Sequence, residues 1–256
     1  MSNYCCVETG RIKNMIDIRT FVECASLIPF KTAGCKVYAL SRTKSTLDSL
    51  VEECLDIIPI VADLCDWDGT REKLEQLEVL YKLANIAGIA GHGHDYAAVN
   101  CPKEYINHLL DNNLLSAINC SQVVAKKMIE AGVKGSIVNS SSISGMSGFP
   151  MCLPYAVSKA GMDMVTKQFA LELGPHEIRV NSVNLGLVNT PLVQSLIEKG
   201  KYTVDTFTSR SPIGRISTVE EIVVPILYLL SSHSSMVTSQ MHVVDGGCLS
   251  NITVKV

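Results

Sequence analysis

Short apolar runs alternate with longer helix-like segments along most of this chain, and this alternation limits the possible folds more than any other feature. The runs are rich in valine and isoleucine. They cover Lys36–Arg42, Ile57–Leu64, Leu83–Gly88, Ser136–Ser142, Ile178–Asn184 and Met241–Asp245. The helix-like segments cover Lys44–Cys54, Lys103–Ala131, Pro154–Leu173 and Val219–Ser231. Near-continuous apolar strands separated by helices predict an α/β fold with a doubly wound parallel sheet, covered by helices on both faces.

The length and composition indicate one domain without a membrane span. With 256 residues, 47% of them hydrophobic, the chain can bury a large core, and no linker or repeat divides residues 1–256. The formal net charge of −3 gives no reason to expect nucleic acid or an anionic membrane as a partner. Charged residues interrupt the first twenty positions, and no run of about eighteen uncharged apolar residues follows. We expect neither a secretory signal nor a transmembrane helix.

The ten cysteines are scattered and form no Cys-x-x-Cys pair. Several lie within apolar segments, as free thiols in a reducing compartment do, which favours a cytoplasmic protein. His92 and His94 lie in a glycine-rich stretch without further spaced ligands. We therefore expect no metal site.

The sheet also predicts where a ligand binds, because ligands of open parallel sheets lie beyond the carboxyl ends of the strands. Polar residues, in some cases followed by glycine, stand at several of those ends: Ser41–Arg42, Asp63, Asn85–Gly88, Ser142 and Asn184–Thr190.

Tyr155 and Lys159 are four residues apart in a predicted helix and therefore share one face. The ammonium group would stabilise the phenolate and draw the phenol pKa from about 10 toward neutrality, which suits proton exchange with a carbonyl or alcohol oxygen. Ser142, at the end of the preceding strand, would hydrogen-bond the same oxygen. An isolated Tyr-x-x-x-Lys pattern usually marks an exposed helix face. The sequence Asn139-Ser140-Ser141-Ser142 and the small-residue loop with Gly145 favour the catalytic interpretation.

Adjacent asparagines, Asn112 and Asn113, interrupt the helix predicted over Lys103–Ala131. Asparagine forms helices poorly because its amide competes for backbone hydrogen bonds. The pair is either simply exposed or places an amide that bends the helix and holds a water molecule near the lysine.

Together these residues resemble the short-chain dehydrogenase/reductase family, and within it the L-xylulose reductases and tetrameric carbonyl reductases. The resemblance runs from about Gly34 to Gly247 and is densest in SRTKSTLDSLVEEC, in YAVSKAGMDMVTKQFALELGPHEIRVNSVN and in the closing VVDGG. It implies a Rossmann-type fold, an NADP(H) cofactor and an oxidoreductase that acts on CH–OH groups. It also implies a homotetramer and a small-molecule carbonyl substrate.

The resemblance assigns a role to each of four residues. Tyr155 is the general acid that protonates the carbonyl oxygen in reduction. Lys159 lowers the pKa of that phenol and holds the cofactor ribose. Ser142 positions and polarises the substrate oxygen, and Asn113 anchors a water molecule that connects the lysine to solvent.

The end of the second predicted strand bears on cofactor choice. A carboxylate there binds the ribose 2′-hydroxyl of NAD, whereas an arginine accommodates the 2′-phosphate of NADP. Arg42, between Ser41 and Thr43, favours NADP because its guanidinium suits a bidentate phosphate contact, although arginines at strand ends are often merely exposed. The further cofactor-binding residues implied by the resemblance are Gly10, Asp63, Leu64, Asn85, Ala87, Gly88, Tyr155, Lys159, Val188 and Thr190.

The N-terminus departs from the family pattern. The family opens with a strand that runs into T-G-x-x-x-G-x-G, whose glycines let the backbone approach the pyrophosphate. Here Thr9-Gly10 is followed by RIKNMI, and Glu8 stands where a buried strand requires an apolar residue. Residues 11–31 are therefore atypical, through divergence or through an altered reading frame or splice form. Ile86 and Leu185 are smaller departures from the family motifs.

These observations leave three functional hypotheses. The first is NADPH-dependent reduction of a small carbonyl compound, either a ketose such as L-xylulose or an α-dicarbonyl. The second is a non-catalytic relative with impaired cofactor binding that acts as a subunit or binding protein. The third keeps the chemistry but takes a hydroxysteroid or a 3-oxoacyl substrate. Phe149, Met151 and Leu153 predict an apolar wall on one side of the substrate, and the segment 192–215 would cover the other.

Overall fold

The computed structural model describes residues 15–18, 36–53, 57–90, 96–198, 205 and 208–250. Gly10 and the pair His92 and His94 lie outside these ranges, as does most of the atypical segment 11–31. The described residues form a seven-stranded parallel sheet in the order β3-β2-β1-β4-β5-β6-β7. The doubly wound parallel sheet predicted from the sequence is confirmed.

The strands are β1 (Met15–Ile18), β2 (Val37–Ser41), β3 (Ile57–Val61), β4 (Lys82–Asn85), β5 (Ser136–Ser142), β6 (Arg179–Leu185) and β7 (Met241–Val244). The helices are α2 (Lys44–Glu53), α3 (Trp67–Glu75), α4 (Lys103–Leu110), α5 (Ser116–Glu130), α6 (Leu153–Leu173), α7 (Pro191–Glu198) and α9 (Val219–Leu230). Shorter helical turns are η2 (Ala98–Asn100), η3 (Asp111–Leu115), η4 (Ile143–Gly145), η5 (Gly174–His176), η6 (Ser232–Ser234) and η7 (Cys248–Ser250).

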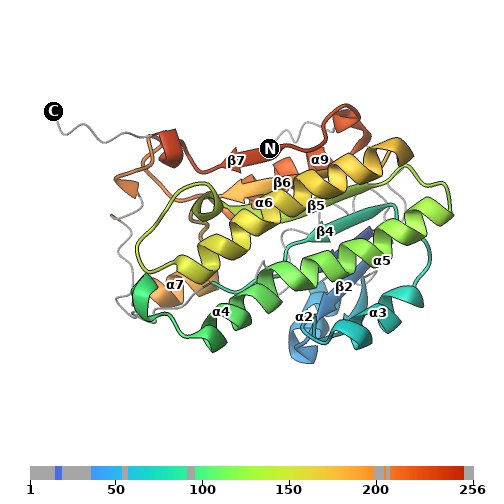
Figure 1. The fold of residues 1–256 in the computed structure, drawn as a ribbon, viewed down its shortest axis with the longest axis horizontal. Helices are drawn as coiled ribbons and strands as arrows, with labels where there is room; N and C mark the ends of the chain where they lie inside the picture. The colour runs from blue at the N-terminus through green and yellow to red at the C-terminus, as the bar shows by residue number, and fades with distance from the viewer. Residues whose placement is uncertain are drawn as a thin grey trace.

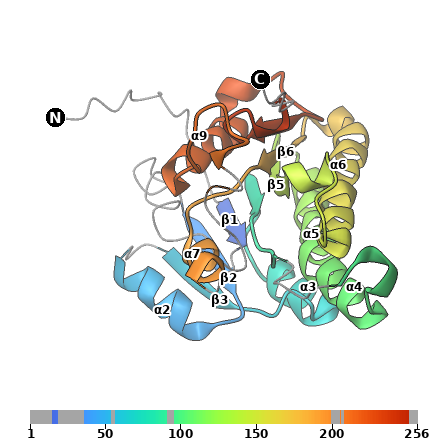
Figure 2. The ribbon, with the colours of Figure 1, turned by 90° about the vertical axis from the view of Figure 1, so that its left-hand side faces the viewer.

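Helices cover both faces of the sheet, as Figures 1 and 2 show from two directions. One core lies between the strands and helices α3, α5 and α6, and the other lies between the strands and helices α2 and α9. Alternation along β2 divides its side chains between the two cores. Tyr38 and Leu40 enter the first, and Val37 and Ala39 enter the second. Successive side chains of a strand point to opposite faces, so a strand buried on both sides must be apolar throughout.

The strand order creates a switch point beside β1. The chain passes from β1 outward to β2 and β3, and then returns to place β4 on the other side of β1. Connections that leave β1 and β4 therefore diverge at the carboxyl edge of the sheet, which is where open α/β sheets bind ligands. Ser41, at the end of β2, and Ser142, at the end of β5, both reach this edge.

Most predicted elements are present, and the first strand is the main correction. By the family pattern, the first strand would run directly into Thr9-Gly10, whereas β1 spans Met15–Ile18 and pairs with both β2 and β4. Gly10 thus precedes β1, and the connection at the carboxyl end of β1 begins at residue 19.

Two of the described helices were not predicted, and two strands are shorter than expected. Helix α3 is polar, and its Asp66 cap accepts a hydrogen bond from Gly69 N. Helix α7 lies in the segment that the sequence assigned to a covering loop. Strands β3 and β4 end at Val61 and Asn85. None of the described helices is long and apolar enough to cross a lipid bilayer.

Candidate active site

The side chain of Lys159 is buried where α6 lies against β5. Lys159 is 4% exposed, and its Nζ donates a hydrogen bond to Ser140 O at 2.7 Å. Ser141 Oγ donates to Lys159 O at 3.1 Å, so two consecutive residues of β5 hold this turn of α6. Lys159 Nζ lies 5.7 Å from the centre of the Tyr155 ring. The helix thus brings the tyrosine and the lysine together, as their spacing predicted.

A close backbone contact holds the end of β5 against the same turn of α6. A Cβ atom on Gly145 would lie 2.7 Å from Lys159 C and 2.8 Å from Ala160 N, so only glycine fits here. The short turn η4 that contains Gly145 begins directly after Ser142. Ser142 Oγ accepts a hydrogen bond from Ser144 N at 3.1 Å and lies 3.4 Å from Leu185 O. The candidate serine is therefore fixed at the sheet edge by its neighbours on both sides.

Asn113 connects α6 to the segment that follows β4. The helical winding changes to a π-helix over Asp111–Leu115, and Asn113 within it is fully buried. Asn113 Oδ1 accepts from Ile89 N at 2.7 Å, while Nδ2 donates to Ile89 O at 2.9 Å and to Ser158 Oγ at 3.2 Å. Single π-turns within α-helices occur frequently at functional sites. The asparagine pair is thus more than an exposed interruption of the helix.

Gly88 joins this cluster to an open cleft. A Cβ atom on Gly88 would lie 3.1 Å from Asn113 Oδ1 and 3.5 Å from Lys159 Nζ. Gly88 also lines the cleft, which opens to solvent at the carboxyl edge of the sheet. The other lining residues are Arg42, Ala62, Asp63, Leu64, Ala87 and Asn112. The cleft therefore extends from the exposed arginine after β2 to Gly88, which lies next to the buried lysine of α6.

Burial sets the charge of the lysine. Desolvation lowers the pKa of Lys159 to about 8, and the Asp163 carboxylate on the next turn of α6 partly opposes this shift. A lysine in this range changes its charge only slightly above neutral pH. The group can therefore respond to a nearby proton transfer.

The predicted residues at the ends of β2 and β3 lie around the cleft. Ser41 is buried, and its Oγ accepts a hydrogen bond from Thr43 N at 3.3 Å. Asp63 accepts from Cys65 N at 3.1 Å, which closes the turn after β3. The Arg42 side chain is exposed and lines the cleft, so it is accessible to a ligand.

Asn85 occupies a different environment. Its Nδ2 donates to Ser121 Oγ at 2.9 Å and to Asn139 Oδ1 at 2.8 Å, so it joins a buried polar group between β4, β5 and α5. Its Oδ1 is buried without a hydrogen-bond partner among the described residues.

The segment that contains Val188 and Thr190 is held by the chain that leads into α9. Val188 forms a parallel bridge with Ser217, and Asn189 N donates to Ser217 O at 2.8 Å. Thr190 Oγ1 accepts from Val193 N at 3.3 Å at the start of α7. Both candidate nicotinamide-binding residues thus lie on a strand-like segment beyond β6, next to a second segment at 215–218.

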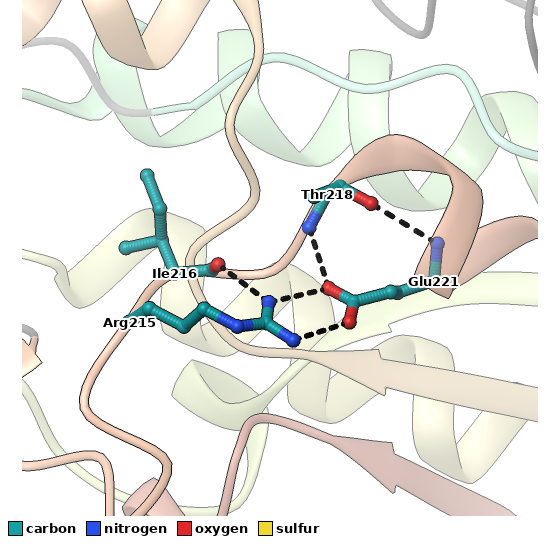
Figure 3. Close-up of polar contacts among 4 residues, drawn as sticks. All are labelled: Arg215, Ile216, Thr218 and Glu221. Atoms are coloured by element: carbon teal, nitrogen blue, oxygen red, sulfur yellow. Dashed lines mark hydrogen bonds and ion pairs between the residues drawn. The ribbon is translucent and has the colours of Figure 1, made fainter.

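That second segment is tied to α9 by the contacts in Figure 3. Arg215 donates from Nη1 and Nη2 to the two carboxylate oxygens of Glu221 at 2.7 and 2.6 Å. Glu221 Oε2 also accepts from Thr218 N, and Glu221 N donates to Thr218 Oγ1, which completes a capping box at the start of α9. The exposed ion pair and the cap together fix the chain that pairs with Val188.

The structure brings the four predicted catalytic residues (the tetrad Asn113, Ser142, Tyr155 and Lys159) and most predicted cofactor-binding residues to one edge of the sheet. Gly10 lies outside the described residues. Sequence reasoning missed Ala62 and Asn112 as lining residues and Asp163 as the charge next to the lysine. The i, i+4 spacing of Lys159 and Asp163 was the available signal.

A nicotinamide dinucleotide is the group that such a fold implies, and the arrangement around Gly88 fits it. A Cβ atom at this position would approach Asn113 Oδ1 to 3.1 Å, which is tighter than ordinary contact, so glycine suits the close approach of this cleft wall to the asparagine. Arg42 offers a cation in the lining of the cleft, and Lys159 is a second, buried cation next to Gly88.

Comparisons with known proteins agree with this geometry. Residues 28–249 match the family model described as "Enoyl-(Acyl carrier protein) reductase". The chain is 40% identical over 228 residues to L-xylulose reductase of Mus musculus, covering 88% of this chain and 91% of that protein. It is 37% identical over 219 residues to carbonyl reductase [NADPH] 2 of Sus scrofa, covering 86% and 88%.

A solved structure supports the same assignment. A short-chain type dehydrogenase/reductase from Mycobacterium marinum superposes with a TM-score of 0.85 at 28% identity, over 94% of this chain and 97% of that one. With the sheet order, the Tyr155–Lys159 helix and these matches taken together, the chain belongs to the short-chain dehydrogenase/reductase family, a family of oxidoreductases.

Proposed function

We propose that this protein reduces a small carbonyl compound to the alcohol with NADPH, the substrate being a ketose such as L-xylulose or an α-dicarbonyl. The observation that carries the proposal is the buried Lys159 ammonium next to Tyr155, close to Gly88 in the lining of an open cleft. Two relatives at 40% and 37% identity are named L-xylulose reductase and carbonyl reductase [NADPH].

The chain's own residues supply the proton and orient the carbonyl group. A bound dihydronicotinamide would supply the hydride. Tyr155 donates its phenolic proton to the carbonyl oxygen, and charged Lys159 stabilises the phenolate that remains. Ser142, fixed at the end of β5, hydrogen-bonds the same oxygen. Asn113 holds the backbone of Ile89 beside the lysine and, by resemblance to the family, anchors a water molecule through which the proton is replaced.

Arg42 supports NADPH over NADH. The exposed guanidinium at the end of β2 lines the cleft where an adenosine ribose would lie. A planar guanidinium binds a phosphate group in a bidentate manner, whereas it gains little from a ribose hydroxyl. Ser41, Thr43, Asp63 and Leu64 complete the adenosine end of the proposed site, and Val188 and Thr190 the nicotinamide end.

One observation favours the non-catalytic alternative. The connection between β1 and β2 covers residues 19–36 and contains a single glycine, Gly34. A dinucleotide site of this type uses several glycines directly after the first strand to bring the backbone close to the pyrophosphate. Under the alternative hypothesis, the tetrad is retained but cofactor binding is too weak for turnover.

Titration with NADPH separates the two hypotheses. We expect saturable quenching of protein fluorescence and energy transfer to the dihydronicotinamide, with a dissociation constant in the micromolar range and weaker binding of NADH. Turnover is then measured with L-xylulose and diacetyl, and in parallel with a steroid ketone and a 3-oxoacyl thioester. Absence of binding by a protein with a folded circular dichroism spectrum would favour the non-catalytic alternative. Turnover of only the last two substrates would retain the chemistry and replace the substrate class.

Replacement of the general acid tests the mechanism. Tyr155→Phe removes one hydroxyl and retains the ring next to Lys159, so NADPH affinity should change by less than about twofold. Carbonyl reduction should fall at least about 10³-fold, because the proton donor is lost. Rates and fluorescence titrations of the two proteins check this. A variant that keeps a tenth of the wild-type rate would contradict the role of Tyr155.

We also propose a homotetramer, the assembly implied by resemblance to the tetrameric carbonyl reductases. Val157, Met164 and Leu171 of α6 are 48, 60 and 74% exposed and recur every seven residues, which places them along one stripe of the helix. Leu115, the last residue of η3, and Ile129, near the end of α5, are 41 and 37% exposed. An apolar stripe of this kind is suited to burial against another subunit. Sedimentation equilibrium should give four times the chain mass, and a monomer at micromolar concentration would contradict the proposal.

A further inference from the structure

Helix α6 carries a buried carboxylate that the proposed mechanism does not use. Lys159 and Asp163 are the charged side chains that the described part of the chain buries to below a tenth of their full exposure, at 4 and 9%. They stand four residues apart on one helix and therefore face the same side. Burying a charge is costly unless an opposite charge or several hydrogen bonds compensate it.

The hydrogen bonds around Asp163 connect it to the end of β5. Asn184 Nδ2 donates to Asp163 Oδ2 at 2.7 Å and lies 3.4 Å from Ser142 O. Ser182 Oγ lies 3.2 Å from Asp163 Oδ1 and 2.9 Å from Asn184 Oδ1, so its single proton serves one of them at a time. The carboxylate therefore accepts one short hydrogen bond and shares a second, and Lys159 is the buried cation on the preceding turn of the same helix.

The surroundings of Lys159 contain few other charges. Strand β5 contributes serines, β6 contributes Ser182 and Asn184, and η3 contributes Asn113, all of them neutral. Tyr155 is the titratable neighbour on the same helix. The charged or titratable groups of α4 and η3, which also lie against α6, are exposed or bound elsewhere: Lys103, Glu104, His108 and Asp111 are exposed, and Tyr105 lies against Tyr96.

We propose that Asp163 is a positioning residue that keeps Lys159 in its charged form and, through Asn184, holds the Ser142 backbone at the edge of the sheet. The catalytic consequence rests on the proposed function, because a charged lysine matters there by stabilising the Tyr155 phenolate. The electrostatic part does not depend on it. Burial alone would favour neutral lysine, and the carboxylate on the next turn opposes that effect.

Charge and packing are separated by a matched set of variants. Asp163→Asn retains nearly the same shape and removes the charge, and the smaller Asp163→Ser also removes it. Asp163→Glu retains the charge. Ser182→Ala removes a hydrogen bond to the carboxylate but leaves the carboxylate in place. A structural role alone would make Ser182→Ala and the uncharged variants behave alike.

The readout is the titration of Lys159 itself, followed by NMR of protein labelled with ¹³C at the lysine Cε positions. The Lys159 resonance is the one missing from Lys159→Met. We expect a wild-type midpoint near pH 8. The midpoint should fall by about one pH unit or more in an uncharged variant. It should stay within a few tenths of a unit in Ser182→Ala and in Asp163→Glu. An unchanged midpoint in whichever uncharged variant folds, or an equal fall in Ser182→Ala, would overturn the proposal.

Turnover provides a second, independent readout. For carbonyl reduction, the alkaline limb of the kcat/KM profile should move to lower pH in Asp163→Asn, and Asp163→Glu should restore it. An alkaline limb that does not move while the NMR midpoint does would overturn the catalytic consequence of the charge. If the wild-type protein reduces no carbonyl compound, the proposed function fails, while the NMR titration still decides whether Asp163 sets the charge of Lys159.

Discussion

Two buried side chains of the candidate site, Asn113 and Lys159, each contact more than one partner. Asn113 forms three hydrogen bonds, to both backbone groups of Ile89 and to Ser158. Lys159 is bonded to the backbone of β5 and lies against the Tyr155 ring. Both residues are buried, and a buried polar group that loses a partner pays the full cost of desolvation. Displacing either side chain would therefore cost the hydrogen bonds that it forms.

Arg42 provides a prediction at the residue scale. Arg42→Asp places a carboxylate where the 2′-phosphate of NADPH would lie. The affinity of the variant protein for NADPH should therefore fall by about 10- to 100-fold, the range expected for loss of a hydrogen bond to a charged group. NADH affinity should fall by less than about threefold. Arg42→Lys, which keeps the charge but loses the bidentate geometry, should lie between them. Fluorescence titrations with both cofactors check this, and equal losses would remove the argument for NADPH.

At the scale of elements, the contact between η4 and α6 decides where the site lies. The turn after β5 approaches the α6 backbone at Lys159 so closely that a Cβ atom has no room at Gly145. On the other side, the π-turn η3 brings Asn113 against the segment after β4. The catalytic turn of α6 is thus held between two other elements, and its position follows from packing rather than from the helix alone.

A pair of glycines in one loop provides the prediction at this scale. Gly145→Ala should lower the free energy of unfolding by about 1–3 kcal/mol, because a methyl group forced against backbone atoms displaces η4 or α6. Gly148→Ala is the matched control, since a Cβ atom there has no neighbour within 4 Å. Its effect should be within about 0.5 kcal/mol. Urea denaturation of both variants checks this, and equal stabilities would show that η4 adapts without cost.

At the scale of the whole molecule, the sheet separates a neutral core from a polar edge. Side chains of the central strands are buried on both faces, and polar residues concentrate at the carboxyl ends of β2, β4 and β5. The buried charges of Lys159 and Asp163 lie at this boundary. Because burial of the lysine opposes its charged form, the stability of the entire fold depends on the protonation of this one group.

The pH dependence of unfolding tests that link. Burial lowers the pKa of Lys159 to about 8, below its ordinary value of 10.5, so between these values the unfolded chain binds more protons than the folded one. The free energy of unfolding should therefore rise with pH in this window, relative to Lys159→Met, with a slope of at most about 1.4 kcal/mol per pH unit. Denaturant titrations of both proteins from pH 7 to 10.5 measure the difference.

The comparison with Lys159→Met removes the effects of other groups. Burial raises the pKa of the Cys120 thiol from its ordinary value of 9.0 to about 12. This thiol therefore lowers the free energy of unfolding of both proteins as the pH rises above 9.0. A difference between the two proteins that does not change with pH would mean that Lys159 titrates in the folded protein as it does in the unfolded one.

Sequence patterns predicted much of the fold because they report burial directly. The runs predicted at Lys36–Arg42 and Ser136–Ser142 match β2 (Val37–Ser41) and β5 (Ser136–Ser142) almost residue for residue. Helix α3 was missed because its sequence, WDGTREKLE, is mostly polar and its apolar side chains are few. Strand β1 was misplaced because the expectation followed the Thr9-Gly10 motif rather than the apolar residues of MIDI. A motif without its flanking strand is weak support for an element.

The sequence by itself determined the doubly wound parallel sheet, the pairing of Tyr155 with Lys159 and the polar strand ends, because periodicity and i, i+4 spacing are local properties of a chain. Only the tertiary structure placed Gly88 against both Asn113 and Lys159, and Asp163 against Ser182 and Asn184. Those contacts join segments that are distant in sequence, and the packing of strands and helices decides which of them meet.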